Sequence, residues 1–348
     1  MLPEPRGTVG VVFGGANSEH EVSVRSARGV GGALAANGWR VRLLGIDRGG
    51  AWHEVESVDD FEGLSAAASA ARRPPGPRDG QLDGLDVVFP VLHGVRGEDG
   101  TVQGLLELAG LPYVGCGVLA SALAMDKRMA SRMLAAEGIP VIDTRSVTSF
   151  DELDEVVGGM PLPLFIKPNR SGSSVGVSWV DALDELLPAV RGAMLEDSTV
   201  LIQPAQRGTE VSIGVLEQPG GALAVTGASV LRLPASATHF SYKGKYGTAR
   251  DDDHARLEIP AELPAELLAS LQGAARAVFD TLGCAGLARV DFFVDPHGDI
   301  VVNEVNTMPG FAEQSHFPRL WAAAGVGYRD LVDRLVEGAM ARVALSVR

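Results

Sequence analysis

The chain has 348 residues, enough for two or three domains, and its hydrophobic (46%) and charged (21%) fractions are ordinary for a globular protein. Its net charge of −14 disfavours a nucleic-acid partner, because binding a phosphate backbone needs a basic face. Its two cysteines, Cys116 and Cys284, each stand among apolar residues, which disfavours a disulfide framework or a zinc site. Without a signal peptide or an apolar run of membrane-spanning length, we predict a cytoplasmic protein with no membrane partner.

The first predicted unit opens with a strand, a glycine turn and a helix. Residues 8–13 are an apolar run typical of a buried strand, Gly14 and Gly15 turn the chain, and a helix is expected over 21–37. Such a corner favours anions, and ligands of open α/β sheets bind at the carboxyl ends of the strands. Glu19 lies there as a candidate binding residue. Alternatively, it only stabilises the helix N-terminus.

Two further strands and two helices follow. We expect strands over 41–46 and 85–92, a surface connection with a short helix over 58–83, and helices over 101–109 and 121–136. His93 ends the third strand and opens a glycine-rich loop, so a functional role and a satisfied core histidine are equally good interpretations. Lys127 lies on the last helix, and we place the first domain boundary near residue 120.

The middle of the chain contains a candidate phosphate-binding loop. A helix is expected over 150–158, strands over 164–166, 200–202 and 210–215, and a hinge over 203–206. The first of these strands leads into Lys167 and a loop of small and hydroxyl-bearing residues that ends at Gly176. Backbone N–H groups of such a loop can line a phosphate while Lys167 supplies charge. A flexible hairpin turn is the alternative, but a turn would not need the lysine.

Residues 238–253 form a polar, aromatic segment punctuated by glycine. We predict that this segment is a lid, long enough to close over a site. A disordered insertion is the alternative, although paired lysines and tyrosines would be unusual in one. An amphipathic helix over 264–282 follows, and the chain ends with a loop over 310–319 and a helix over 327–344.

Two strands over 287–294 and 300–305 flank a turn and predict a hairpin. Because side chains alternate between the faces of a strand, Arg289 shares a face with Asp291, and Glu304 with Asn306. Paired strands bring the four together. Two carboxylates and an amide oxygen suit Mg²⁺, and the arginine can hold an oxyanion. The alternative is a plain salt bridge between Arg289 and Asp291, which leaves Glu304 unexplained in an apolar run.

Several motifs, in order and spread over nearly the whole chain, resemble the D-alanine–D-alanine ligases of the ATP-grasp superfamily. The matching stretches are Phe13-Gly-Gly-Ala-Asn-Ser-Glu-His-Glu-Val-Ser23, His93-Gly-Val-Arg-Gly-Glu-Asp-Gly100 with Gln103-Gly104, Pro112-Tyr-Val-Gly115, Met125-Asp-Lys127, Lys167-Pro with Gly172-Ser-Ser-Val-Gly176, Lys245-Tyr246, and Arg289-Val-Asp291 with Asn303-Glu-Val-Asn-Thr-Met-Pro-Gly310. The resemblance implies an α/β fold of three-domain ATP-grasp architecture. It has an N-terminal Rossmann-like (pre-ATP-grasp) domain over 1–120, a central ATP-grasp subdomain over 121–215 and a C-terminal one over 216–348, which carries the lid.

The resemblance also implies the chemistry. ATP phosphorylates the carboxylate of one D-alanine, and the amine of a second D-alanine displaces phosphate, giving D-alanyl-D-alanine for peptidoglycan precursors. The roles it implies are catalysis by Glu19, Ser173, Tyr246, Arg289 and Gly310, substrate binding by His93, Ser315 and His316, ATP binding by Lys127, Lys167, Ser174, Gln203, Glu210 and Lys245, and binding of two Mg²⁺ (or Mn²⁺) ions by Asp291, Glu304 and Asn306. The family also suggests a homodimer.

Two departures from the family pattern bear on substrates. Gln203-Pro204 stands where many members have Glu-Lys at the adenine edge, although a glutamine can still accept a hydrogen bond from the adenine amino group. His316 stands where dipeptide ligases often carry Leu or Met, so D-serine or D-lactate is the alternative acceptor, in resistance or specialised metabolism. Lys245-Tyr246 in the lid disfavours D-lactate. A catalytically idle nucleotide-binding regulator is a further alternative, against which the intact set of polar residues argues.

Overall fold

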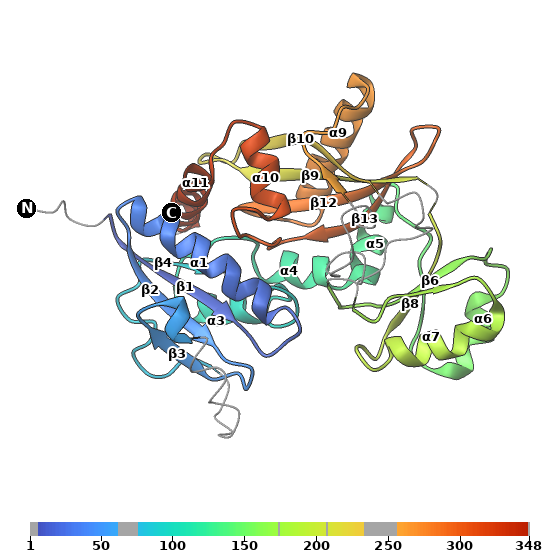
Figure 1. The fold of residues 1–348 in the computed structure, drawn as a ribbon, viewed down its shortest axis with the longest axis horizontal. Coiled ribbons are helices and arrows are strands. Elements are labelled where there is room, and N and C mark those ends of the chain that lie inside the picture. Colours follow the sequence, from blue (N-terminus) through green and yellow to red (C-terminus); the bar gives the residue numbers. More distant parts are fainter. Residues whose placement is uncertain (1–5, 62–75, 173–174, 207, 233–255, 347–348) are drawn as a thin grey trace, which may run out of the picture.

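Three β-sheets flanked by helices make up the fold, which confirms the predicted α/β class (Figure 1). The computed structural model describes residues 6–61, 76–172, 175–206, 208–232 and 256–346. In this part of the chain, no helix combines the length and the apolar character that crossing a membrane requires.

The N-terminal sheet begins with a strand that is followed by a tight glycine turn. Its elements are β1 (Thr8–Gly14), α1 (His20–Ala36), β2 (Arg40–Ile46), β3 (Trp52–Val55), β4 (Val87–Pro90) and α3 (Thr101–Leu108), with strand order β3-β2-β1-β4. Strand β1 runs parallel to both β2 and β4. A Cβ atom at Gly14 would lie 2.2 Å from the Ile46 carbonyl oxygen, and φ there is 91°, so this turn requires glycine.

The central sheet is wholly antiparallel and has the strand order β5-β8-β6-β7. Its elements are β5 (Arg145–Val147), a 3-10 turn (Phe150–Glu152), α6 (Leu153–Val157), β6 (Leu164–Pro168), β7 (Ser178–Val180), a second 3-10 turn (Leu183–Glu185), α7 (Leu186–Ala193) and β8 (Val200–Pro204). Gln203 and Pro204 pair with β6 as the last residues of β8. The first half of the predicted hinge is therefore wrong, because the sheet holds it.

The C-terminal sheet is also antiparallel, with the order β11-β10-β9-β12-β13. Its elements are β9 (Thr209–Glu217), β10 (Leu223–Arg232), β11 (Arg256–Glu258), α9 (Ala265–Thr281), β12 (Leu287–Val294), β13 (Ile300–Asn306) and α10 (His316–Ala323). Alternate residues of β9 serve opposite faces. Ile213 packs in the core with α9, whereas Gly214 lets α10 approach, since a Cβ there would lie 3.2 Å from Trp321 Nε1.

A break between two helices brings Lys127 to the site. The single helix predicted over 121–136 is wrong: α4 (Val118–Met125) ends, and α5 (Lys127–Ala136) begins anew. Asp126 between them has extended backbone angles, and its side chain accepts a hydrogen bond of 3.0 Å from Met129 N–H as the N-cap of α5. Lys127 is therefore the first residue of a helix rather than an interior position.

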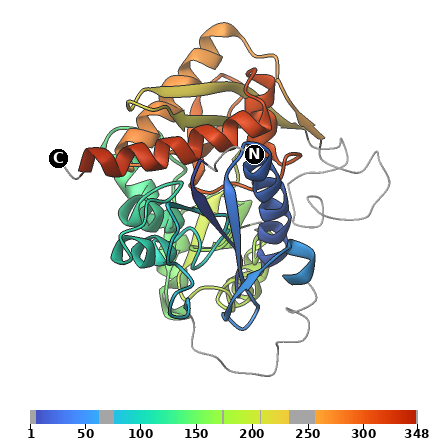
Figure 2. The same cartoon turned by 90° about the vertical axis from the view of Figure 1, so that its left-hand side faces the viewer.

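The end of the chain returns to its beginning. Helix α11 (Tyr328–Ser346) packs along α1, and both views show it beside the N-terminal sheet (Figures 1 and 2). Leu331, Leu335 and Val336 share a buried cluster with Val24 and Val30 of α1. The predicted loop over 310–319 is too long, because α10 already begins at His316.

Candidate active site

Two cavities adjoin, since both are lined by Gly172, Glu210 and Glu304. The smaller, of about 130 Å³, lies between the central and C-terminal sheets. The larger, of about 550 Å³, extends from the C-terminal sheet to the loops of the N-terminal sheet. Twelve of the seventeen predicted site residues line one cavity or the other: Glu19, His93, Lys127, Lys167, Gln203, Glu210, Arg289, Glu304, Asn306, Gly310, Ser315 and His316.

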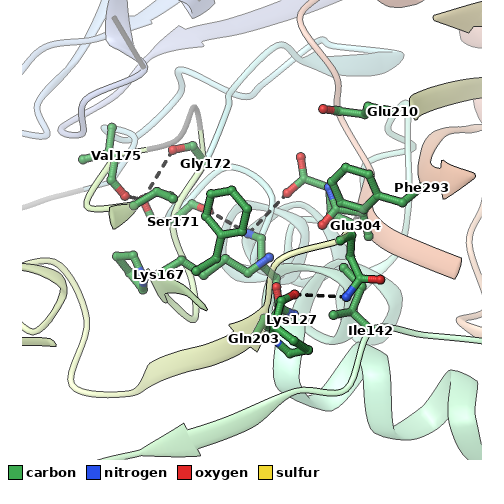
Figure 3. A pocket seen from close by; sticks show the side chains of 16 residues that line it. Lys127, Ile142, Lys167, Ser171, Gly172, Val175, Gln203, Glu210, Phe293 and Glu304 are labelled. Atoms are coloured by element: carbon green, nitrogen blue, oxygen red, sulfur yellow. Dashed lines mark hydrogen bonds and ion pairs between the residues drawn. The ribbon is translucent and has the colours of Figure 1, made fainter. Parts of the chain in front are cut away.

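Two lysines and a glutamate converge in the smaller cavity (Figure 3). Lys127 Nζ donates a 2.7 Å hydrogen bond to the Ser171 carbonyl and lies 3.7 Å from Glu304 Oε2. Burial, followed by the nearby charge of Lys127, lowers the pKa of Lys167 to about 8. Lys127 and Lys167 beside a glycine-bearing loop are cations suited to phosphate oxygens, and the carboxylates of Glu304 and Glu210 line the same cavity.

Part of the wall of the smaller cavity is apolar. Ile142, Phe165 and Phe293 line the cavity together with Gln203, as Figure 3 shows in part. Gln203 is buried, and its Nε2 donates a 2.6 Å hydrogen bond to Thr144 Oγ1. This bond orients the amide and leaves its carbonyl oxygen as an acceptor. Apolar walls with one oriented amide suit a flat heterocycle.

The hairpin of β12 and β13 forms as the sequence predicts, with Arg289 opposite Asn306 and Asp291 opposite Glu304. A bulge follows Asp291 and re-aims the strand. Asp291, 1% exposed, accepts bonds of 2.8 and 2.7 Å from Arg289 and of 3.0 Å from Asn306 Nδ2. The salt bridge considered as the alternative is therefore present, within a larger polar cluster. Burial lowers the pKa of Arg289, but the carboxylates of Asp291 and Glu304 outweigh it and raise the pKa overall.

Glu19 reaches into the larger cavity from the loop between β1 and α1. A Cβ atom at Gly94 would lie 2.6 Å from Glu19 Oε2, and one at Gly172 would lie 2.9 Å from it, so two glycine loops close around this carboxylate. Its side chain makes no capping hydrogen bond to α1. Glu19 precedes α1 directly, so its charge can favour the helix N-terminus as the alternative has it, and its carboxylate also lines the larger cavity.

His93 is 4% exposed, and both of its ring nitrogens contact the protein. Nδ1 lies 2.8 Å from the Met308 carbonyl oxygen and Nε2 lies 3.2 Å from Ser26 Oγ. Burial is the largest influence on this imidazole and lowers its pKa, which keeps the ring neutral. The core interpretation of His93 is therefore correct in part, although the ring also borders the larger cavity.

The far end of the larger cavity is formed by the start of α10 and the strand beside it. Ser315 is the N-cap residue of α10, and His316 is its first residue. His316 Nε2 lies 2.6 Å from Ser229 Oγ on β10. The histidine that departs from the family pattern is thus fixed by a hydrogen bond at the cavity wall.

Sequence reasoning missed Glu98 at the site. Glu98 lines the larger cavity and accepts hydrogen bonds from Gly94 N–H at 2.8 Å and Met308 N–H at 2.9 Å. Burial, followed by the charge of Glu19, raises its pKa to about 8. The available signal was an acidic residue inside the glycine-rich loop that His93 opens.

Some predicted residues cannot be placed. Ser173, Ser174, Lys245, Tyr246 and the rest of the predicted lid over 238–253 lie outside the described residues. Within the described ranges, no group of three or more His, Cys, Asp or Glu side chains is arranged to hold a metal ion. A metal bound at the hairpin would need the amide of Asn306 and non-protein ligands besides Asp291 and Glu304.

Known proteins match this chain over nearly its whole length. Family models described as D-ala D-ala ligase N-terminus and C-terminus match residues 8–116 and 133–337. D-alanine–D-alanine ligase A of Chromobacterium violaceum is 39% identical over 353 residues, covering 95% of this chain and 94% of that protein.

Solved structures agree. The VanG D-Ala:D-Ser ligase from Enterococcus faecalis superposes with a TM-score of 0.83 at 34% identity, covering 96% of this chain and 99% of that one. The D-alanine-D-alanine ligase from Coxiella burnetii gives 0.82 at 31% identity, covering 99% and 96%. These matches confirm the ATP-grasp fold class and the resemblance drawn from the motifs. The chain belongs to the D-alanine–D-alanine ligase family.

Proposed function

We propose that this enzyme uses ATP to join two D-alanines into D-alanyl-D-alanine, for peptidoglycan precursor synthesis in the cytoplasm, where ATP is available. The observation that carries the proposal is the pair of adjoining cavities that share Glu304. One offers two lysines to a nucleotide's phosphates, and the other offers Glu19 and Arg289 to amino acids. The acidic chain fits small-molecule partners rather than nucleic acid. A homodimer stays a prediction.

The chemistry follows from where the charges lie. A carboxylate oxygen of the first D-alanine attacks the γ-phosphorus of ATP, ADP leaves, and an acyl phosphate forms. The free amine of the second D-alanine then attacks the carbonyl carbon, whose bond to the phosphate oxygen breaks. Arg289 uses two donor nitrogens on Asp291, and its remaining N–H groups, with the Gly310 N–H, can hold the carbonyl oxygen as it gains charge.

The binding roles follow the same geometry. Glu19 holds the ammonium of the first substrate, and Ser315 with His316 faces the acceptor. Lys127, Lys167, Gln203 and Glu210 bind ATP. From the family pattern we assign Ser174 and Lys245 to ATP, and Ser173 and Tyr246 to closure of the lid, which would exclude water from the acyl phosphate.

The hairpin fits divalent metal ions. Asp291, Glu304 and Asn306 present hard oxygen donors, and Glu304 lines both cavities with a side chain that is 29% exposed. Asp291 has four acceptor positions, of which three are used. We propose that these residues hold two Mg²⁺ (or Mn²⁺) ions, with Glu304 shared. Such ions would neutralise phosphate charge during transfer.

An isotope experiment tests the acyl phosphate route. D-alanine labelled with ¹⁸O in its carboxylate is incubated with enzyme, Mg²⁺ and ATP, and the inorganic phosphate is analysed by mass spectrometry. The route transfers one labelled oxygen to each phosphate released with dipeptide, because the oxygen that attacks phosphorus stays with it. Unlabelled phosphate formed together with dipeptide would exclude the route. Absence of both products would favour a nucleotide-binding regulator.

The acceptor depends on His316. We expect His316→Leu to raise KM for the acceptor, or to shift the ratio of D-alanine to D-serine used, by roughly tenfold or more, the loss of one hydrogen bond to a charged group. KM for ATP should stay unchanged, since His316 lines only the larger of the two cavities. Competition between the two amino acids measures the ratio. His297→Leu, in the exposed turn of the hairpin, is the control. A parental ratio and KM in His316→Leu would make this histidine a space-filling residue.

A further inference from the structure

The loop after β13 is held by side chains from the other side of the larger cavity. Met308 N–H donates to Glu98 Oε1 at 2.9 Å, and the Met308 carbonyl accepts from His93 Nδ1 at 2.8 Å. Phe311 N–H donates to Ser26 Oγ at 3.0 Å. These three partners belong to α1 and to the loop after β4, more than 200 residues earlier in the chain. Backbone groups on both sides of Gly310 are therefore fixed from outside the C-terminal sheet.

The direction of these bonds is determined by chemistry. A carbonyl only accepts, so the hydrogen of the neutral His93 ring is on Nδ1, and Nε2 is an acceptor. Ser26 Oγ lies 3.2 Å from that Nε2 and 2.9 Å from the Val22 carbonyl, so its proton has two acceptors. Whichever of these two acceptors the Ser26 hydroxyl donates to, a lone pair on its oxygen remains to accept from Phe311 N–H. Ser26 and His93 are buried, so water does not compete freely for their hydrogen bonds.

These contacts leave one backbone donor for the substrate. Pro309 has no N–H, and its ring fixes φ, which stiffens the segment. Among the described residues, no acceptor binds the Gly310 N–H, and Gly310 lines the larger cavity. The flanking residues are thus immobilised while the Gly310 donor faces the space where the substrate carbonyl would lie. A donor must be fixed before the reaction to stabilise developing charge without reorganisation.

We propose that Ser26, His93 and Glu98 are positioning residues that aim the Gly310 N–H at the carbonyl oxygen of the first substrate. This inference rests on the proposed function and replaces a direct substrate contact for His93. Glu98 Oε2 also holds Gly94 N–H at 2.8 Å, next to the Glu19 carboxylate. The group that binds the substrate's ammonium and the group that polarises its carbonyl are thereby held in one connected unit.

Glu98→Gln tests the proposal. A carboxyl group in either protonation state has two oxygens that can accept, whereas an amide nitrogen cannot, so either Met308 or Gly94 loses its acceptor. We expect kcat for dipeptide synthesis to fall about tenfold to a hundredfold, somewhat less than complete removal of an oxyanion donor. KM for ATP should change less than twofold. A phosphinate dipeptide analogue, whose tetrahedral phosphorus mimics the attacked carbon, should bind weaker by the same factor as kcat.

Controls separate positioning from general damage. Glu107→Gln removes a carboxylate that binds Tyr113 Oη at 2.8 Å, outside both cavities, and should leave kcat and phosphinate affinity unchanged. Ser26→Ala removes the acceptor of Phe311 N–H and should lower kcat and phosphinate affinity in the same way. This variant tests the proposal if Glu98→Gln does not fold. Parental kcat and phosphinate affinity in the folded variants would overturn the proposal. Absence of dipeptide from the unmodified enzyme would instead contradict the proposed function.

Discussion

Glu304→Gln is expected to abolish turnover while the protein stays folded. The carboxylate lines both cavities and lies 3.7 Å from Lys127 Nζ, so under the proposed function its charge acts on the nucleotide and the amino acid together. At the proposed metal site, neutralising it would weaken metal binding, and it also removes a carboxylate whose charge acts on both Lys127 and Lys167. We expect kcat to fall by about a thousandfold or more, as when a major electrostatic group is removed from a phosphoryl-transfer site.

Phosphate release measured over a series of Mg²⁺ concentrations checks this expectation. Glu155→Gln on the exposed face of α6 makes the same chemical change away from the cavities and should keep full activity. The melting temperature of Glu304→Gln should stay close to that of the parent, because the side chain is 29% exposed. Near-parental turnover at low Mg²⁺ in Glu304→Gln would refute the assignment of this carboxylate to the metal.

Lys167→Met should lower kcat/KM for ATP by about a hundredfold, because the proposed phosphate-binding site loses a partly buried cation. The parent should also lose kcat/KM for ATP as pH rises through about 8, the pKa to which burial and Lys127 lower this amine. The sign follows from charge: below that pH the amine is protonated and attracts phosphate, and above it the amine is neutral. The measurement is kcat/KM for ATP as a function of pH, from roughly two units below to roughly two units above that pKa, which is from about pH 6 to about pH 10.

Lys167→Arg separates this lysine from Glu98, whose pKa also lies at about 8. An arginine stays charged over the whole range, so part of the activity should return and the alkaline decline should disappear. A decline that persists unchanged in Lys167→Arg would show that another group, with Glu98 the first candidate, causes it.

Local sequence predicts the hairpin well. The strand over 287–294 is found with the predicted bounds, and the second extends by one residue, to Asn306. The alternation of side chains along each strand of the hairpin determines which of them share a face. The turn residues determine where the strands end. The residues Arg289, Asp291 and Glu304 could be grouped because their proximity depends only on neighbouring strands.

Other features depend on tertiary contacts that no local pattern contains. Asp126 lies within what reads as one helix, and only its extended backbone between α4 and α5 makes it a cap. Thr226 and Ser229 interrupt the apolar residues of β10, so the local sequence does not mark this segment as a strand. Its hydrogen-bonded pairing with β9 makes it one. Glu98 binds Met308, 210 positions further along the chain, and a contact at that distance is invisible to motif spacing.

The most direct test of the proposed function is mass spectrometry of the products formed from ATP, Mg²⁺ and an equal mixture of D-alanine, D-serine and D-lactate. The proposal predicts that D-alanyl-D-alanine is the main product and that one ADP accumulates for each dipeptide. D-alanyl-D-serine or D-alanyl-D-lactate as the main product would contradict the assigned acceptor. ATP consumption without any ligated product would contradict the ligase itself.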